Sequence, residues 1–168
     1  MIFFQYVQAK DAYQHLLHDN PKHAKALQRL GWLYHQDGSP FKNQDLAIEY
    51  LTNSLESGKR SPLCVEFSSS SDNIDSNDAE SWHLLGRVYM ARQENLKAFE
   101  AYQQAVYRDG RNPTFWCSLG ALYFQFNQYR DARDMYARAA DLAPNNPAIA
   151  EQIQLLRNVQ GNGVQDDA

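Results

Sequence analysis

Residues 79–112 read AESWHLLGRVYMARQENLKAFEAYQQAVYRDGRN, residues 113–146 read PTFWCSLGALYFQFNQYRDARDMYARAADLAPNN, and these two stretches decide the fold. The residues that define their common pattern stand 34 apart: Trp82 and Trp116, Leu85 and Leu119, Gly86 and Gly120, Tyr89 and Tyr123, Ala98 and Ala132, Tyr102 and Tyr136, Ala105 and Ala139. So many matches at one separation are not chance. The chain therefore contains a 34-residue repeat.

The pattern W-x-x-L-G-x-x-Y, followed by A-x-x-x-[FY] and a late Pro, resembles the tetratricopeptide repeat (TPR), a helix-turn-helix unit. Residues 113–146 fill every signature position, including Pro144, whereas residues 79–112 carry Gly110 at their end in place of the proline. The resemblance implies an all-α fold, a right-handed superhelical solenoid of antiparallel helix pairs with a C-terminal capping helix. It predicts helices over residues 3–18, 24–36, 44–57, 79–91, 96–109, 113–125, 130–142 and 147–158.

The glycines of the pattern have a physical use. Gly86 and Gly120 fall inside predicted helices, where glycine costs about 1 kcal/mol relative to alanine. We expect them to let the two helices of one repeat approach closely. Alanines seven residues apart on each second helix keep the facing surface small, which agrees with that expectation.

The rest of the chain follows the same pattern less regularly. Residues 24–57 form a third repeat with four extra residues around 37–40, and residues 1–21 fit a half repeat that has only its second helix. Residues 58–78 are expected to be a mobile Ser/Asp/Asn-rich loop, and residues 159–168 a disordered tail. The loop is interpreted as a passive linker; phosphorylation of Ser69, three residues before Asp72, is the weaker alternative.

Composition narrows the possible functions. Sixteen basic and twenty acidic residues leave a net charge of −4, which argues against direct nucleic-acid binding. No apolar run approaches the length of a membrane span, so no membrane association is expected. Cys64 and Cys117 have no partner at ligand spacing and are interpreted as reduced thiols of an intracellular protein.

Catalytic motifs are not found in the sequence. There is no phosphate-binding loop, no nucleophile elbow and no H-E-x-x-H pair. His15, His18 and His23 lie close together but lack a carboxylate or Cys at matching spacing, so a metal site is not expected. The sequence predicts a protein that is not an enzyme, with no cofactor, no metal and no small-molecule substrate.

A concave groove is the remaining candidate for function, because a stack of helix pairs creates one. In the family, the first helix of each repeat lines the groove at repeat positions 2, 5, 9, 12 and 13, counted here from residues 24, 79 and 113. The predicted partner-binding residues are Lys25, Gln28, Trp32, His35, His83, Arg87, Met90, Thr114, Phe124 and Gln125. For Trp32 and Phe124, packing between repeats is an open alternative. The Lys/Asn clamp of chaperone-binding repeats is missing, since Gln28, His83 and Cys117 occupy position 5.

A more specific resemblance covers roughly residues 6–157, interrupted by the insertion at 58–77. It is carried by residues 103–120, 122–123 and 128–132, and residues 9–17 and 30–35 fit the same group. These stretches are similar to the repeats of the fungal TPR general transcriptional corepressor, the partner of a WD40 corepressor, and to the TPR region of the UTX histone demethylase. The resemblance implies a non-catalytic scaffold in the nucleus that bridges DNA-bound repressors and the WD40 corepressor. A generic cytoplasmic TPR adaptor in another assembly is the alternative. We expect a shorter array than in the family, because a capping helix follows the Pro144 repeat directly, and the Ser/Asp loop is peculiar to this chain.

Overall fold

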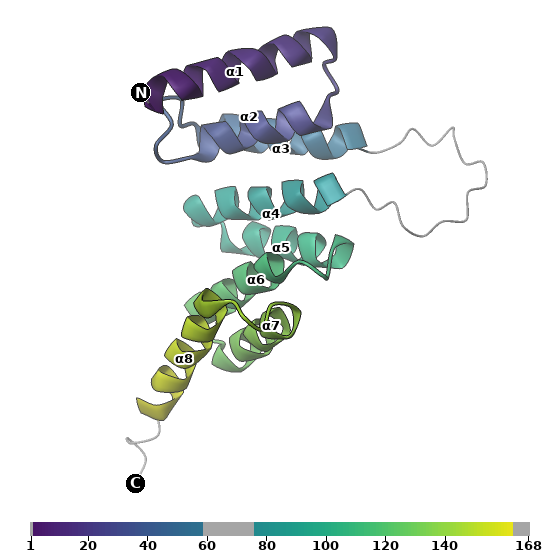
Figure 1. Cartoon of the computed structure of the whole chain (residues 1–168). Helices are drawn as coiled ribbons and strands as arrows, with labels where there is room; N and C mark the ends of the chain where they lie inside the picture. The colour runs from purple at the N-terminus through teal and green to yellow at the C-terminus, as the bar shows by residue number, and fades with distance from the viewer. Residues whose placement is uncertain (1, 59–75, 163–168) are drawn as a thin grey trace, which may run out of the picture. The chain divides into compact units, whose positions relative to one another are not determined.

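A computed structural model describes residues 2–58 and 76–162 (Figure 1). Within these two stretches the chain forms helices and no strand. The helices are α1 (Ile2–Asp19), α2 (Ala24–His35), α3 (Gln44–Gly58), α4 (Ser76–Ala91), α5 (Asn95–Arg108), α6 (Pro113–Gln125), α7 (Tyr129–Leu142) and α8 (Pro147–Asn162). The predicted all-α fold is confirmed, and most helix ends fall within one residue of their predicted places.

Two helix ends differ from the prediction. α4 begins at Ser76 rather than at 79, because Asp78 lies in its first turn, where a carboxylate is favoured by the helix dipole. α8 continues from 158 to Asn162, so the first residues of the predicted tail are helical. The helix ends at Gly161 and Asn162, which are poor helix formers. The remainder of the predicted loop and tail, including Ser69, lies outside the described residues.

Local signals explain where several helices begin and how paired helices are joined. The Asn112 side chain accepts a hydrogen bond from the Thr114 amide at the start of α6, with Pro113 at the first helical position. Between the paired helices of the two regular repeats, Gln93 and Asn127 adopt φ values of 63° and 59°. They stand 34 residues apart, so the turn, like the helices, is repeated.

The chain forms two compact units, residues 1–108 and 109–168. The first contains α1 to α5, and its core is built around Leu30, Leu51 and Val88, each with no exposed surface. The second contains α6 to α8, and its core includes Tyr136 and Leu156. Each core therefore joins the apolar faces of successive helices of the repeat pattern.

The expected close approach at the glycines is confirmed. A Cβ atom placed on Gly86 would lie 2.5 Å from the ring of Tyr102, and one on Gly31 would lie 2.7 Å from Leu51 Cγ. At Gly120 the corresponding distance to the Tyr136 ring is 3.2 Å. In all three repeats the first helix thus uses its glycine to pack directly on the second helix.

Candidate partner-binding face of α2 and α4

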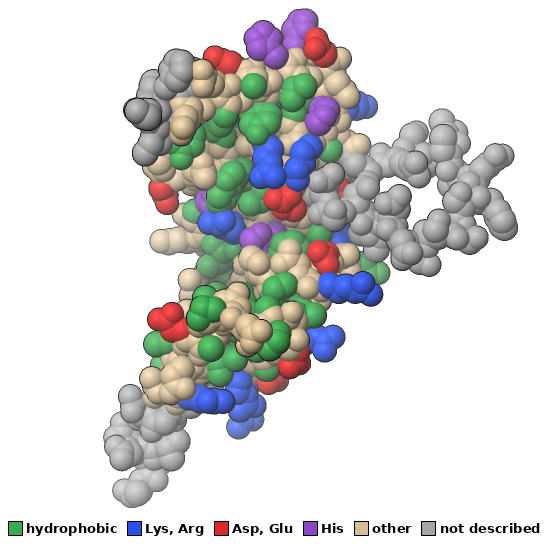
Figure 2. Space-filling view, in the orientation of Figure 1, with side chains coloured by type: hydrophobic (Ala, Val, Ile, Leu, Met, Phe, Trp, Pro, Cys, Tyr) green, Lys and Arg blue, Asp and Glu red, His purple; other side chains and the backbone are tan. Residues whose placement is uncertain are grey.

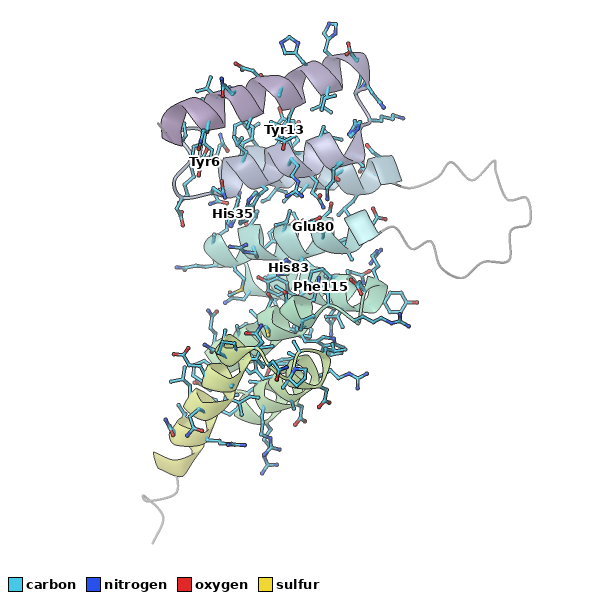
Figure 3. All side chains as sticks on the ribbon, in the orientation of Figure 1. Tyr6, Tyr13, His35, Glu80, His83 and Phe115 are labelled. Atoms are coloured by element: carbon cyan, nitrogen blue, oxygen red, sulfur yellow. The ribbon has the colours of Figure 1, made fainter. Side chains whose placement is uncertain are left out.

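The first helices of neighbouring repeats, α2 and α4, lie side by side in the first unit (Figure 3). Lys25 Nζ lies 2.7 Å from Glu80 Oε2, and Arg29 Nη1 lies 4.0 Å from Glu80 Oε1. Figure 2 shows basic side chains over α2 directly beside acidic ones. These side chains are more than a third exposed, so the ion pairs add at most about 1 kcal/mol of stability.

A buried polar chain joins α2, α3 and α4 beneath this surface. Gln28 Nε2 donates to Ser81 Oγ at 3.0 Å, and Ser54 Oγ donates to the Ala24 carbonyl at 2.9 Å. The two serine oxygens are 3.2 Å apart. Because the Ser54 proton is directed to Ala24, Ser81 is the donor between the serines. The side chains of this hydrogen-bonded network, Gln28, Ser54 and Ser81, are at most 2% exposed. The network therefore fixes the spacing of the three helices.

Above the buried chain, an arginine stacks on a tryptophan. The Arg87 guanidinium carbon lies 4.5 Å from the centroid of the Trp32 ring, and the Trp32 and His35 rings are 5.3 Å apart. Arg87 is exposed and Trp32 partly exposed. No carboxylate of the described residues lies within ion-pair distance of Arg87. The stack therefore presents a cation on a flat aromatic surface, at a site where such a contact contributes about 0.5–1 kcal/mol.

The two histidines of this region are held neutral at pH 7. Burial, reinforced by the charge of Arg87, lowers the pKa of His83 to about 4. Burial also lowers the pKa of His35, although a hydrogen bond between its Nδ1 and Gln44 Oε1, at 3.2 Å, acts in the opposite direction. The positive charge of this region therefore comes from Lys25, Arg29 and Arg87.

The structure divides the residues predicted to bind a partner. Gln28 and His83 are 1% and 7% exposed, so their side chains support the face from behind. Five others of the first unit have accessible side chains and form what we call the α2–α4 face: Lys25, Trp32, His35, Arg87 and Met90. Trp32 is available for binding a partner and also packs against the core of the first unit, so both interpretations of this residue agree with the structure.

The other three predicted residues lie on α6, in the second unit. Thr114 and Gln125 are exposed. Phe124 is partly exposed; its ring meets that of Tyr129 edge-on at 5.5 Å and it packs against the core of this unit. Part of the Phe124 side chain is therefore buried by packing within the second unit, and the rest is exposed.

Sequence reasoning missed a cavity between α1 and α2. Its volume is about 580 Å³. Its walls include Tyr6, Ala9 and Tyr13 of α1 and Arg29, Trp32 and Leu33 of α2. The available signal was Tyr13, an aromatic residue of the half repeat identified in the sequence, which forms part of the cavity wall.

The described residues offer little for metal binding or membrane insertion. In residues 2–58 and 76–162, no three His, Cys, Asp or Glu side chains are grouped so that they could hold a metal ion. Of the described helices, none has both the length and the apolar character to cross a bilayer.

Comparison with known proteins agrees with this architecture. Residues 77–147 match the tetratricopeptide repeat family. The chain contains a TPR region. Among solved structures, the fold resembles MamA, with a TM-score of 0.70 and 22% identity over 96% of this chain and 81% of that one. It also resembles YrrB, with a TM-score of 0.67 and 17% identity over 90% of this chain and 68% of that one. The chain is thus an all-α TPR solenoid.

Three corepressors have higher sequence identity to this chain than the solved structures do, but over a shorter segment. The chain is 58% identical over 93 residues to the general transcriptional corepressor ssn6 of Schizosaccharomyces pombe, which is 55% of this chain and 7% of that protein. It is 54% identical over 59% of its length to the corepressor trfA of Dictyostelium discoideum, and 46% identical over 52% to CYC8 of Saccharomyces cerevisiae. The matched segments are only 6% and 7% of these two relatives. The chain is homologous to general transcriptional corepressors over about half its length.

Proposed function

We propose that this chain is a non-catalytic protein-interaction scaffold of a nuclear transcriptional corepressor, and that its α2–α4 face binds a segment of a protein partner. The observation that carries the proposal is the 58% identity to a general transcriptional corepressor over 93 residues. Identity at this level, within a repeat whose pattern fixes few positions, supports a shared role as well as a shared fold.

The chemistry of the face defines the segment that it would accept. Arg87 provides an exposed guanidinium that is held in place by stacking on Trp32, and no carboxylate of residues 2–58 or 76–162 lies within ion-pair distance of it. Met90, one helical turn further along α4, adds an adaptable apolar contact. Arginine, aromatic residues and methionine are enriched at interfaces, and arginine and tryptophan are frequent hot spots. The face therefore suits a partner segment that carries an acidic residue next to an apolar one.

The resemblance in sequence supplies candidate partners. The fungal corepressor resemblance implies a WD40 corepressor subunit and segments of DNA-bound repressors, and hence a nuclear location. The UTX resemblance implies the same scaffold role. Binding in this form needs neither direct contact with nucleic acid nor a small-molecule substrate.

The test is binding of the N-terminal segment of the WD40 corepressor to the chain and to folded variants. Arg87→Ala and Met90→Ala remove side chains of the α2–α4 face. Loss of a central anchor costs about 2 kcal/mol, so we expect affinity to fall about 30-fold for the more important of the two. Arg133→Ala is the control, because Arg133 is an exposed residue of α7, outside the face.

Two results would count against the proposal. Unchanged affinity in both face variants, with a loss in Arg133→Ala, would place the binding site on the second helices. Failure of the parent chain to bind the WD40 segment would favour the generic cytoplasmic adaptor, and co-purification from nuclear and cytoplasmic extracts would then separate the two locations.

A further inference from the structure

The first unit fills the space between its two neighbouring first helices with its own side chains. Lys25 and Glu80, both at repeat position 2, form an ion pair. Gln28 at position 5 of α2 donates a hydrogen bond to Ser81 at position 3 of α4, and both side chains are buried. At this place α2 and α4 therefore meet through two pairs of contacting polar side chains.

The second unit carries smaller or apolar residues at the same four positions. Thr114 and Ala148 stand at position 2 of α6 and α8, Cys117 at position 5 of α6, and Ile149 at position 3 of α8. A cleft of about 230 Å³ lies here between α6 and α8 (Figure 1), and all four residues line it. The place that the first unit fills with its own side chains is thus left open in the second.

The most buried walls of the cleft are apolar, and its exposed rim carries carboxamides. Ile149 is 3% exposed, and Cys117 is partly buried, with a thiol whose pKa is raised by burial, so that it is neutral at pH 7. Asn146 and Gln152 are exposed at the rim. Asn146 Oδ1 accepts a hydrogen bond from the Ala148 amide at 3.1 Å, so its Nδ2 group is the one that a ligand would meet.

The size and charge of the cleft determine what it can accept. An apolar cavity of about 150 Å³ holds a molecule of benzene, so this cleft has room for one apolar side chain of the size of leucine or phenylalanine. A charged side chain would lose hydration there without meeting an opposite charge on the walls. The Nδ2 group of Asn146 suits a backbone carbonyl, which favours a side chain that belongs to a polypeptide over a free apolar molecule.

From this comparison we infer that the α6–α8 cleft is a docking site for a segment of a partner protein, which inserts one uncharged, apolar side chain where the first unit places its own Gln28. The backbone of that segment lies at the rim, where one of its carbonyl groups accepts a hydrogen bond from Asn146. The inference goes beyond the proposed function and does not depend on the α2–α4 face, because all the residues that would bind the segment belong to the second unit.

The experiment is a titration of the full chain with short peptides, followed by the NMR signals of the Ala148 and Ile149 methyl groups. The probe is the tripeptide glycine-leucine-glycine, blocked at both ends, and it should shift both signals in a saturable manner. The same tripeptide with glutamate or lysine at its centre should bind at least about tenfold more weakly. Arg87→Ala should leave the leucine titration unchanged, which separates this site from the α2–α4 face.

Variants of the chain locate the site. Cys117→Gln restores the side chain that the first unit has at position 5, and Ala148→Gln narrows the cleft from α8; each should weaken leucine binding, followed at Ile149, by about tenfold or more. Ala121→Gln is the matched control, because Ala121 is an exposed residue of α6 outside the cleft wall, and it should change binding less than about twofold. Ala148 is exposed, so its variant keeps the test decisive even if Cys117→Gln does not fold.

Four results would overturn the inference. They are no saturable shift with the leucine tripeptide, equal binding of the charged tripeptides, full binding by folded cleft variants, and shifts at Ala148 and Ile149 that follow the protein concentration without any peptide. The last result would assign the cleft to a second copy of this chain. The comparison of tripeptides uses the parent chain, so it decides the matter without any variant.

Discussion

Replacing Gly86 by alanine should destabilise the protein, although alanine is the better helix former. The added Cβ would lie 2.5 and 2.6 Å from two ring carbons of Tyr102. That ring is 4% exposed and lies 5.7 Å from the His83 ring, so it has little room to move away. Overpacking of this kind costs about 1–3 kcal/mol, against a gain in helix propensity of about 1 kcal/mol. Contacts this short belong in the upper half of that range, about 2–3 kcal/mol, so the expected net loss in the free energy of unfolding is about 1–2 kcal/mol.

Gly120→Ala is the matched comparison, because Gly120 occupies the same repeat position. Its Cβ would lie 3.2 Å from the Tyr136 ring and 3.3 Å from Met135 Cβ, so shifts of a few tenths of an ångström would suffice. The packing cost and the gain in helix propensity should then nearly cancel, to within about 0.5 kcal/mol of the parent. Urea denaturation followed by far-ultraviolet circular dichroism measures both variants.

A double-mutant cycle identifies the cause. With Tyr102→Ala as background, the ring that obstructs the new Cβ is gone, and Gly86→Ala should lose most of its cost. The reasoning would be refuted if Gly86→Ala were as stable as the parent, or if its cost were the same with and without the Tyr102 ring. In that case the approach of α4 to α5 would not depend on the glycine.

Three other perturbations test separate parts of the structure. The folded pKa of His83 is about 4 and its unfolded pKa about 6.5. The contribution of His83 to stability should therefore be full above pH 6.5 and should fall by up to about 3 kcal/mol as the pH is lowered from 6.5 to 4; His83→Gln should reduce this slope in denaturation curves. Gly120→Val adds a branched side chain at the contact with Tyr136 and should cost about 1–3 kcal/mol, and a variant of parental stability would mean that the repeat register is wrong. Deleting residues 62–76 should shift the melting temperature only slightly, because long loops add little closure entropy; collapse of the fold would show that the segment packs into the core.

Much of the fold could be predicted from the sequence because the helix signals are local and repeated. The spacing of Trp, Gly, Tyr and Ala fixed the faces of the helices, and the turns at Gln93 and Asn127 lie between them as the register requires. The prediction was less accurate where no pattern residue marks an end. α4 extends to Ser76, with Asp78 in its first turn, and α8 continues until the poor helix formers Gly161 and Asn162 end it.

The candidate site was harder to predict, because repeat position alone does not determine exposure. Gln28 enters the core since its neighbours there, Ser54 and Ser81, are small and offer hydroxyl partners. The pairing of Trp32 with Arg87 depends on the offset between α2 and α4, which side-chain packing sets and which no local signal encodes. The one sequence signal for the burial of Gln28 is Ser81, a small hydroxyl residue that lies opposite it and accepts its hydrogen bond.

Repeat position 5 shows why these details decide the function. Gln28 and His83 are buried there, and Cys117, at the same position of the last repeat, is partly buried, with its thiol pKa raised by burial. A clamp for a terminal carboxylate needs an exposed cation at this position, whereas in this chain the position holds neighbouring elements together. In the proposed function, contacts with a partner would therefore be made by positions 2, 9 and 12 of the first unit. In the α2–α4 face the side chains at those positions are a lysine, a stacked Trp32–Arg87 pair, His35 and Met90, so side-chain recognition of a partner segment, and not capture of a chain terminus, is the binding mode that this geometry favours.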